Sequence, residues 1–356
     1  METKKIYVGS AQCGMKLASD VYDASSRLIV KAGTVLDDTI INKLNIYSVY
    51  SINVVVDAIK EEKVEYKNYY ERLKETEEFK GFKAKFEESV DGLRSSLNAM
   101  VTKNVMVDED KMLNDVKSVI EANKKGSSML DMLNCMQGYD DLTYVHSMNV
   151  ALISNVMAGW LGMSEEDTKI LTLAGLLHDI GKVRIPVEIV SKPGKLTDEE
   201  YAIIKSHPQL GYDILKDMHI DERIKKAALM HHERCDGRGY PNKLKGDEID
   251  DFAKIIAIAD VYDAMTADRC YRKGMCPYTV IGHFESEKSV YDVRYLMAFL
   301  ERIANTYVSN EALLSNGQQG KIILINKFKL SKPIVMVGNE IYDLSVMKDL
   351  EVERLL

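Results

Sequence analysis

The histidines of this chain are concentrated in one stretch with helical periodicity. Six of the seven histidines fall between residues 146 and 232, and five of these six, all except His219, lie in an apolar helical context or at a predicted helix end. Two aspartates, Asp179 and Asp260, lie in equally apolar surroundings. Burying charged groups is costly unless they are paired or bind a cation, so this stretch can fold only if its polar side chains meet one another. The set consists of His146, His178, Asp179, His207, His231, His232 and Asp260.

Helical spacing predicts that His178 and His146 point toward the core. His178 ends an apolar stripe formed by Leu171, Ala174 and Gly175, which recur at three- and four-residue steps. His146 lies on the apolar face of its own predicted helix. A single inward histidine is more often a hydrogen-bonded core residue than a ligand, but a set of seven inward groups favours a shared site.

The composition of the set indicates a metal centre. Imidazole and carboxylate are ligands for Fe, Mn, Ni or Zn, and cysteine is not needed. Five imidazoles and two carboxylates are too many for one ion with open positions, and they suit two ions bridged by a shared carboxylate. His231 and His232 diverge by about 100° on a helix, so both could reach one ion, or one could serve a second ion.

Composition excludes several classes of protein. Apolar residues make up 46% of the 356 residues and charged residues 29%, as in globular proteins with a sizeable core. The net charge of -8 argues against a nucleic-acid polymer as partner. No apolar segment follows the N-terminus, no run is long enough to span a membrane, and the five cysteines are scattered. We therefore expect a cytoplasmic protein without a membrane span.

Changes in periodicity divide the chain into four parts. Residues 1–58 are predicted to form a β-rich regulatory or docking module, with strands at 6–8, 28–30 and 54–56 and a helix at 37–44. Residues 59–107 form a helical linker. Residues 108–312 are predicted to be nearly all helix, and residues 313–356 a small β extension with strands at 321–325, 334–337 and 341–342. The fold class is therefore mainly α, with small β parts at both ends.

Two helices of this plan have clear patterns. Apolar residues recur at helical spacing between Phe79 and Met100, which predicts an amphipathic helix. It could pack on the core, or the segment 60–103 could form a homodimer. The segment from Asp251 to Asp260 is apolar on nearly all sides, as is typical of a buried central helix.

Several of these residues lie in motifs that resemble a known family. The segment from His178 to Lys182 (HDIGK) is similar to the motif of HD-domain metal-dependent phosphohydrolases. The segment from His231 to Pro241 (HHERCDGRGYP) resembles the signature of the HD-GYP subfamily, and the segments 207–211 and 260–272 also match its pattern. The resemblance covers about residues 139 to 275. It implies an HD-type helical bundle that holds two or three metals and acts as a cyclic di-GMP phosphodiesterase.

The resemblance also implies roles for individual residues. Asp179 would bridge the two metals, Lys182 would touch the scissile phosphate, and Tyr240, Arg269 and Arg272 would contact the substrate. One metal would be held by His146, His178, Asp179 and Asp260, and the other by Asp179, His207, His231 and His232. Members with a third metal have a glutamate where this chain has Leu142, so we expect two divalent ions, Fe or Mn first and Ni or Zn as alternatives. Cys270 stands where the family usually has proline.

The implied reaction is hydrolysis of a phosphodiester. Two metals activate a bridging water and clamp the phosphate oxygens for in-line attack, while Lys182, Arg269 and Arg272 offset the accumulating negative charge. The expected product is linear pGpG, with further cleavage to GMP left open. The alternatives are a receptor that binds a cyclic dinucleotide without turnover, hydrolysis of cyclic GMP-AMP, and the oxygen activation or nucleotide hydrolysis found in other HD-domain proteins.

Overall fold

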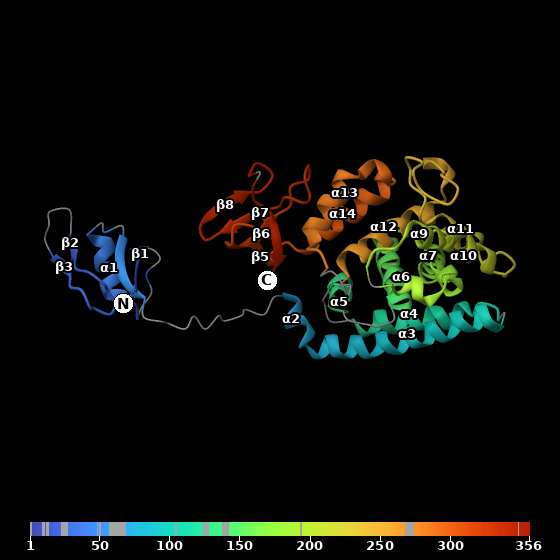
Figure 1. The fold of residues 1–356 in the computed structure, drawn as a ribbon, viewed down its shortest axis with the longest axis horizontal. Coiled ribbons are helices and arrows are strands. Elements are labelled where there is room, and N and C mark those ends of the chain that lie inside the picture. Colours follow the sequence, from blue (N-terminus) through green and yellow to red (C-terminus); the bar gives the residue numbers. More distant parts are fainter. Residues whose placement is uncertain are drawn as a thin grey trace. The chain divides into compact units, whose positions relative to one another are not determined.

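The fold is that of a computed structural model of the whole chain (Figure 1). The structure describes residues 2–8, 11, 14–22, 28–47, 49, 51–56, 69–103, 105–123, 128–136, 142–192, 194–267, 274–347 and 349–356. The chain divides into two compact units, Met1–Tyr66 and Lys67–Leu356.

The N-terminal unit contains two small sheets and one helix. Strand β1 (Glu2–Tyr7) pairs antiparallel with β4 (Ser51–Val56), and β2 (Val21–Tyr22) pairs with β3 (Leu28–Val30). Helix α1 (Asp38–Ile46) lies between β3 and β4 in the sequence. The predicted strands and helix of this unit are thus confirmed, whereas β2 was not predicted. The unit has a small core of its own, which includes the buried side chains of Leu17, Leu36 and Leu44.

The second unit begins with helices, as predicted. Its α-helices are α2 (Tyr69–Lys74), α3 (Glu77–Lys103), α4 (Glu109–Ala122), α5 (Met129–Cys135), α6 (Leu142–Trp160), α7 (Glu165–Leu177), α8 (Val187–Val190), α9 (Asp198–Ile204), α10 (His207–Leu215), α11 (Glu222–Met230), α12 (Asp251–Thr266), α13 (Pro277–Ser286) and α14 (Val293–Thr306). Short 3-10 helices are η2 (Ile180–Arg184), η3 (Gly246–Glu248) and η4 (Lys288–Val290). Within the described residues, no helix has both the length and the apolarity to cross a membrane.

Helix α3 confirms the predicted amphipathic helix. All seven apolar residues of its predicted stripe, from Phe79 to Met100, are buried in the core of this unit. Helix α4 packs along it (Figure 1). A homodimer through α3 would therefore have to use the charged face, and such a dimer stays a prediction.

Helix α12 is the buried helix around which the other site helices pack. It contacts α6, α7, α11, α13 and α14. Its residues from Phe252 to Asp260 are all buried, as the apolar sequence predicted. Asp260 is thereby held in the interior, where α6 and α11 approach it.

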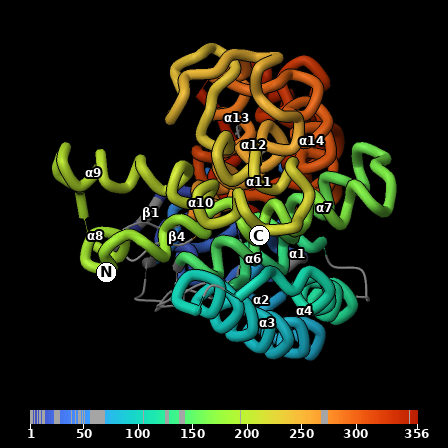
Figure 2. The backbone as a smooth tube through the Cα atoms, turned by 90° about the vertical axis from the view of Figure 1, so that its right-hand side faces the viewer, coloured from blue at the N-terminus to red at the C-terminus, as the bar shows by residue number. Residues whose placement is uncertain are grey.

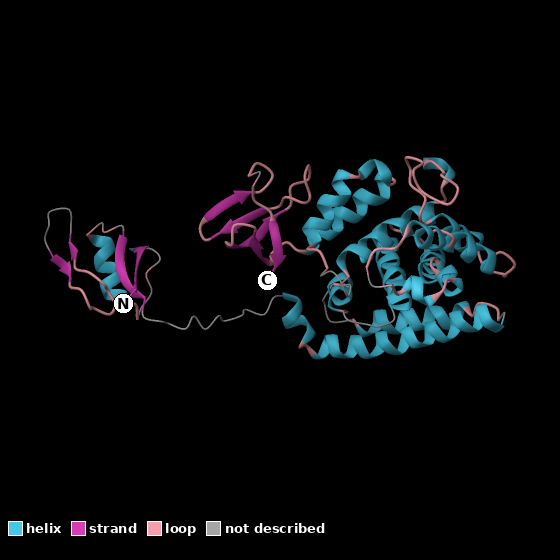
Figure 3. Cartoon of the chain, viewed as in Figure 1, coloured by secondary structure: helices cyan, strands magenta, loops and turns pink. Residues whose placement is uncertain are grey.

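A five-stranded antiparallel sheet follows the helices (Figure 3). Its order is β8-β7-β6-β5-β9, and its strands are β5 (Glu311–Leu314), β6 (Gln319–Leu324), β7 (Ile334–Val337), β8 (Glu340–Asp343) and β9 (Val352–Leu355). Strands β6, β7 and β8 confirm the three predicted strands. Strands β5 and β9 were not predicted, and β5 begins before residue 313, where the extension was expected to start.

A close backbone contact holds η2 against α10. A Cβ atom added at Gly181 would collide with the His207 carbonyl group and lie 2.6 Å from the Gly211 nitrogen. Only glycine fits here, because the clash would be with backbone. The contact fixes the turn that follows His178 and Asp179 relative to the start of α10.

The substitution Gly181→Ala is expected to destabilise the helical unit by about 3 kcal/mol, because overpacking of this kind forces the backbone to move. Urea unfolding followed by circular dichroism measures the change. Gly159→Ala is the matched control. Its added Cβ meets no atom within 4 Å, and alanine favours a helix over glycine by about 1 kcal/mol. An unchanged unfolding midpoint for Gly181→Ala would contradict the close contact between η2 and α10.

Candidate metal centre and its surroundings

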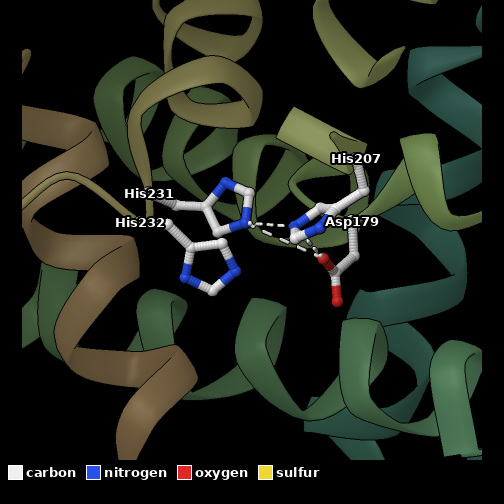
Figure 4. A group of neighbouring side chains, drawn as sticks. All are labelled: Asp179, His207, His231 and His232. Atoms are coloured by element: carbon white, nitrogen blue, oxygen red, sulfur yellow. Dashed lines mark hydrogen bonds and ion pairs between the residues drawn. The ribbon is translucent and has the colours of Figure 1, made fainter. Parts of the chain in front are cut away.

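The seven predicted ligand residues come from five helices and the turns at their ends. Helix α6 carries one, the junction of α7 and η2 carries two, α10 carries one, the end of α11 carries two, and α12 carries one. In chain order they are His146, His178, Asp179, His207, His231, His232 and Asp260. All are buried except His232, which is partly buried. Figure 4 shows four of them turned toward one another.

The structure brings these side chains together in two adjacent groups. Within each group, one potential ligand atom per residue lies within 4.8 Å of every other. The first group is Asp179, His207, His231 and His232, and the second is His146, His178 and Asp260.

The carboxylate of Asp179 lies between the two groups. Its Oδ2 atom is 3.4 Å from Nε2 of His178 and 3.6 Å from Nε2 of His146. Its Oδ1 atom is 3.2 Å from Nε2 of His207 and 3.7 Å from Nε2 of His231. Each oxygen of this one carboxylate thus faces a different set of imidazoles.

Backbone carbonyl groups set the tautomers of three imidazoles. Nδ1 of His178 lies 2.7 Å from the Gly175 oxygen, and Nδ1 of His207 lies 2.7 Å from the Ile204 oxygen. Nδ1 of His231 lies 3.0 and 3.1 Å from two carbonyl oxygens of the preceding turn. A carbonyl oxygen only accepts, so each Nδ1 donates its proton. Each neutral ring then has a lone pair on Nε2, the atom that faces the site.

These lone pairs lack protein partners that could satisfy them. Nε2 of His207 and Nε2 of His231 are 3.1 Å apart, although both rings carry their proton on Nδ1. Among the described residues, Nε2 of His178 and Oδ1 of Asp179 are buried without a hydrogen-bond partner. Two facing lone pairs beside an unpaired carboxylate oxygen repel one another unless a cation lies between them. The residues therefore fit a divalent metal.

The carboxylates of Asp179 and Asp260 are in the deprotonated form that binds a metal cation. Burial alone raises the pKa of Asp179, but the Lys182 ammonium outweighs burial and holds that pKa well below its usual range. Burial also raises the pKa of Asp260, but the hydrogen bond from the protonated His146 outweighs burial and holds that pKa well below its usual range. Both carboxylates are thus ionised at neutral pH.

Burial keeps two of the imidazoles neutral. It lowers the pKa of His231 well below its ordinary value and that of His232 to about 3. His146 differs, since its bonds to Asp260 and Asp263 outweigh burial and raise its pKa to about 9. Its proton must leave if Nε2 is to bind an ion, so metal binding there releases a proton.

Asp263 is a further residue of the site that sequence reasoning missed. Its Oδ2 atom is 2.7 Å from Nδ1 of His146, and its Oδ1 atom accepts a hydrogen bond of 2.7 Å from Asn149. A carboxylate at Nδ1 orients the ring and makes Nε2 a better ligand. The sequence did contain a signal for this role, because Asp263 follows Asp260 by nearly one helical turn and therefore lies close to it on the helix.

Two of the predicted substrate-contacting residues lie beside the metal groups. The Lys182 ammonium forms an ion pair with Oδ2 of Asp179, and its side chain is 22% exposed. The Tyr240 ring stacks on the His232 ring, with centroids 4.7 Å apart and planes at 26°. Arg269 and Arg272 lie outside the described residues, so their roles stay predictions.

Glu233 holds the loop that carries Tyr240, and sequence reasoning missed it as well. This carboxylate is 2% exposed and accepts backbone hydrogen bonds of 2.6 Å from Asn242 and 3.0 Å from Leu244. The loop folds back so closely that a Cβ on Gly239 would lie 2.5 Å from the Glu233 Cα atom. One buried carboxylate therefore ties the chain that follows Pro241 back to the residues that follow α11.

The substitution Glu233→Gln is expected to loosen this loop. A glutamine has one acceptor oxygen, so its amide group would face a backbone N–H, and leaving that donor unpaired costs about 1–3 kcal/mol. Hydrogen exchange should quicken at Asn242 and Leu244 and remain unchanged in α12. The exposed Glu199→Gln serves as control, and equal exchange in both variants would contradict the role given to Glu233.

Comparison with known protein families agrees with this geometry. A family model described as HD domain matches residues 113–294, more than half of the chain. The chain belongs to the HD domain family. The predicted family and the predicted mainly helical HD-type fold are therefore confirmed. The matched residues contain all seven side chains of the two metal groups.

Curated relatives of this HD domain are named for cyclic dinucleotides. The chain is 36% identical over 199 residues to cyclic di-GMP phosphodiesterase PA4108 of Pseudomonas aeruginosa, covering 56% of this chain and 48% of the relative. It is 40% identical over 144 residues to 3'3'-cGAMP-specific phosphodiesterase 2 of Vibrio cholerae, covering 40% of this chain and 28% of that one. The chain thus spans about half or less of the length of these relatives.

A solved structure shares the fold. Bd1817 of Bdellovibrio bacteriovorus, described as an HDG"Y"P protein, matches with a TM-score of 0.52 over 85% of this chain and 99% of that chain. The two sequences are 15% identical, so this likeness concerns the HD-type fold alone.

Proposed function

We propose that this HD-domain protein is a metal-dependent phosphodiesterase that hydrolyses cyclic di-GMP to linear pGpG. Water attacks phosphorus in line with the leaving ribose oxygen, the P–O bond breaks, and the released oxygen takes up a proton. The product carries a 5'-phosphate and a free 3'-hydroxyl. Further hydrolysis of pGpG would yield GMP.

The observation that carries this proposal is the position of Asp179. Its oxygens face two different imidazole sets at 3.2 to 3.7 Å. His146, His178 and Asp260 would hold one divalent ion, and His207, His231 and His232 the other, with Asp179 shared. Fe or Mn is proposed first, and Ni or Zn suits the same donors. When bound, two such ions supply an activated water and neutralise phosphate oxygens.

The residues around the ions would bind and orient the substrate. The Lys182 ammonium lies at the edge of the Asp179 carboxylate and remains partly exposed, so it can offset charge on the phosphate. The partly exposed Tyr240 ring lies over His232, next to where the phosphate would bind. Arg269 and Arg272 are proposed as further phosphate contacts on the basis of their motif.

Turnover of cyclic di-GMP by the full chain tests the proposal. Protein purified without oxygen and loaded with Fe or Mn should hold two ions per chain and release pGpG, identified by mass spectrometry. Protein stripped by a chelator should be inactive and recover when metal is returned. A protein with both ions but no turnover would exclude the phosphodiesterase. If it still bound cyclic di-GMP tightly, the receptor function would replace it.

Cyclic GMP-AMP is the second candidate substrate. It is favoured by the relatives from Vibrio cholerae that are named 3'3'-cGAMP-specific phosphodiesterases 1 and 2, each 40% identical over the aligned segment. Parallel kinetics with the two cyclic dinucleotides will rank them by kcat/KM.

The setting of the enzyme is also proposed from the sequence. We infer a cytoplasmic protein with four parts. Residues 1–58 form a regulatory or docking module and residues 59–107 a helical linker. Residues 108–312 form the catalytic domain, and residues 313–356 form a β extension. The acidic net charge of -8 supports a small substrate in place of a nucleic-acid polymer.

A further inference from the structure

An exposed aromatic side chain lies on the helix that precedes α10. Tyr201 on α9 is 47% exposed. Helices α8 and α9 project at one edge of the helical unit in Figure 2, and the chain continues from them into α10, which begins with His207. None of the motifs that identify the site includes Tyr201.

A lysine joins this tyrosine to the site. The Lys205 ammonium lies 4.4 Å from the centroid of the Tyr201 ring and 5.6 Å from that of the Tyr240 ring. Tyr240 in turn stacks on His232, with centroids 4.7 Å apart. A continuous series of rings and one cation therefore runs from the buried metal group to the surface of α9.

This series has the chemistry of a nucleobase subsite. A tyrosine ring that faces solvent stacks readily on a planar base, and a flexible lysine head can leave the ring when a base arrives. The subsite lies outward from the imidazoles that would hold the metal ions, and therefore outward from the phosphate that those ions would bind, which is where a base attached through a ribose must extend.

We propose that Tyr201 is the stacking platform for one base of the cyclic dinucleotide and that Lys205 covers its ring until the base takes the place of the ammonium. The inference rests on the proposed function, because it identifies the part of the proposed active site that would bind a base of the substrate. Stacking uses the face of a base, which guanine and adenine share. Tyr201 thus contributes affinity for either cyclic di-GMP or cyclic GMP-AMP without choosing between them.

The experiment compares Tyr201→Ala with the wild-type full chain loaded with Mn. Binding is measured by calorimetry with a non-hydrolysable phosphorothioate analogue of cyclic di-GMP. Turnover is measured with cyclic di-GMP, with cyclic GMP-AMP, and with methyl p-nitrophenyl phosphate, a diester without a nucleobase. Tyr201→Phe keeps the ring, and Ile203→Ala is the matched control, since Ile203 is 41% exposed on the same helix.

Tyr201→Ala should weaken analogue binding and lower kcat/KM for both cyclic dinucleotides by roughly tenfold or more, the usual worth of one stacked base. Its metal content and its turnover of methyl p-nitrophenyl phosphate should not change. Tyr201→Phe and Ile203→Ala should behave as wild type.

Other outcomes separate the alternatives. If Tyr201 and Lys205 are merely a surface pair four residues apart on a helix, analogue binding will be unaffected, and the inference is overturned. An equal loss on the base-free diester would also overturn it, because it would mean a structural role. Binding that depends on Tyr201 in a protein without turnover would reject the phosphodiesterase and keep the base subsite. Failure of the wild type to bind the analogue would reject both.

Discussion

Asp179→Asn is expected to remove both metal ions and to lower turnover of cyclic di-GMP by at least about a thousandfold, as does the loss of a central catalytic group in other enzymes. The substitution keeps the size of the side chain but removes its charge. One asparagine oxygen can face only one of the two imidazole sets, and its amide group would point at the other. Because Asp179 faces both sets, the loss should extend to both ions.

Elemental analysis and a turnover assay on the same preparation check this result. Asp213→Asn is the control, because Asp213 pairs with the exposed Lys216 on α10 and does not reach the site. Two ions per chain together with near-normal turnover in Asp179→Asn would show that this carboxylate is not shared. Loss of one ion alone would assign Asp179 to a single group.

Lys182→Met should lower turnover by about a hundredfold to a thousandfold, the typical effect of removing one group that stabilises the transition state. The methionine keeps much of the lysine's length and apolar stem while removing the charge near the expected phosphate position. Metal binding should stay the same or tighten, because the ammonium competes with an ion for Oδ2 of Asp179. The variant therefore separates catalysis from metal retention.

The control for Lys182→Met is Arg184→Met, which removes an exposed cation from the same short helix η2. Its turnover should equal that of wild type. Unchanged turnover in Lys182→Met would exclude contact with the scissile phosphate. A loss that vanishes when excess metal is supplied would mean that Lys182 acts only by holding the site together.

Local patterns predicted those parts of the fold that depend on local physics. The apolar stripe from Phe79 to Met100 and the apolar run ending at Asp260 predicted α3 and α12, because burial at helical spacing is visible in the sequence itself. Strands β5 and β9 escaped prediction for the opposite reason. Ala312 pairs with Leu355, so β5 and β9 are stabilised by pairing between segments that are far apart in the sequence. Short apolar runs in the sequence do not reveal such pairing.

The site shows the same division. The imidazoles and carboxylates stand out in the sequence because polar groups inside apolar helices need partners. Asp263, Glu233 and Tyr201 do not stand out in this way, since an acidic residue or a tyrosine is ordinary in a sequence until the fold shows what lies beside it.

The wide separation of the seven side chains along the sequence has a consequence for the life of the protein in the cell. A ribosome completes His146 long before Asp260, so no nascent fragment can assemble the whole donor set. A metal ion bound by both His146 and Asp260 would connect distant segments only after both had been synthesised. It would then stabilise the folded protein by mass action. Newly made chains starved of that ion would stay open longer to proteases. The abundance of this protein would then depend on the supply of metal.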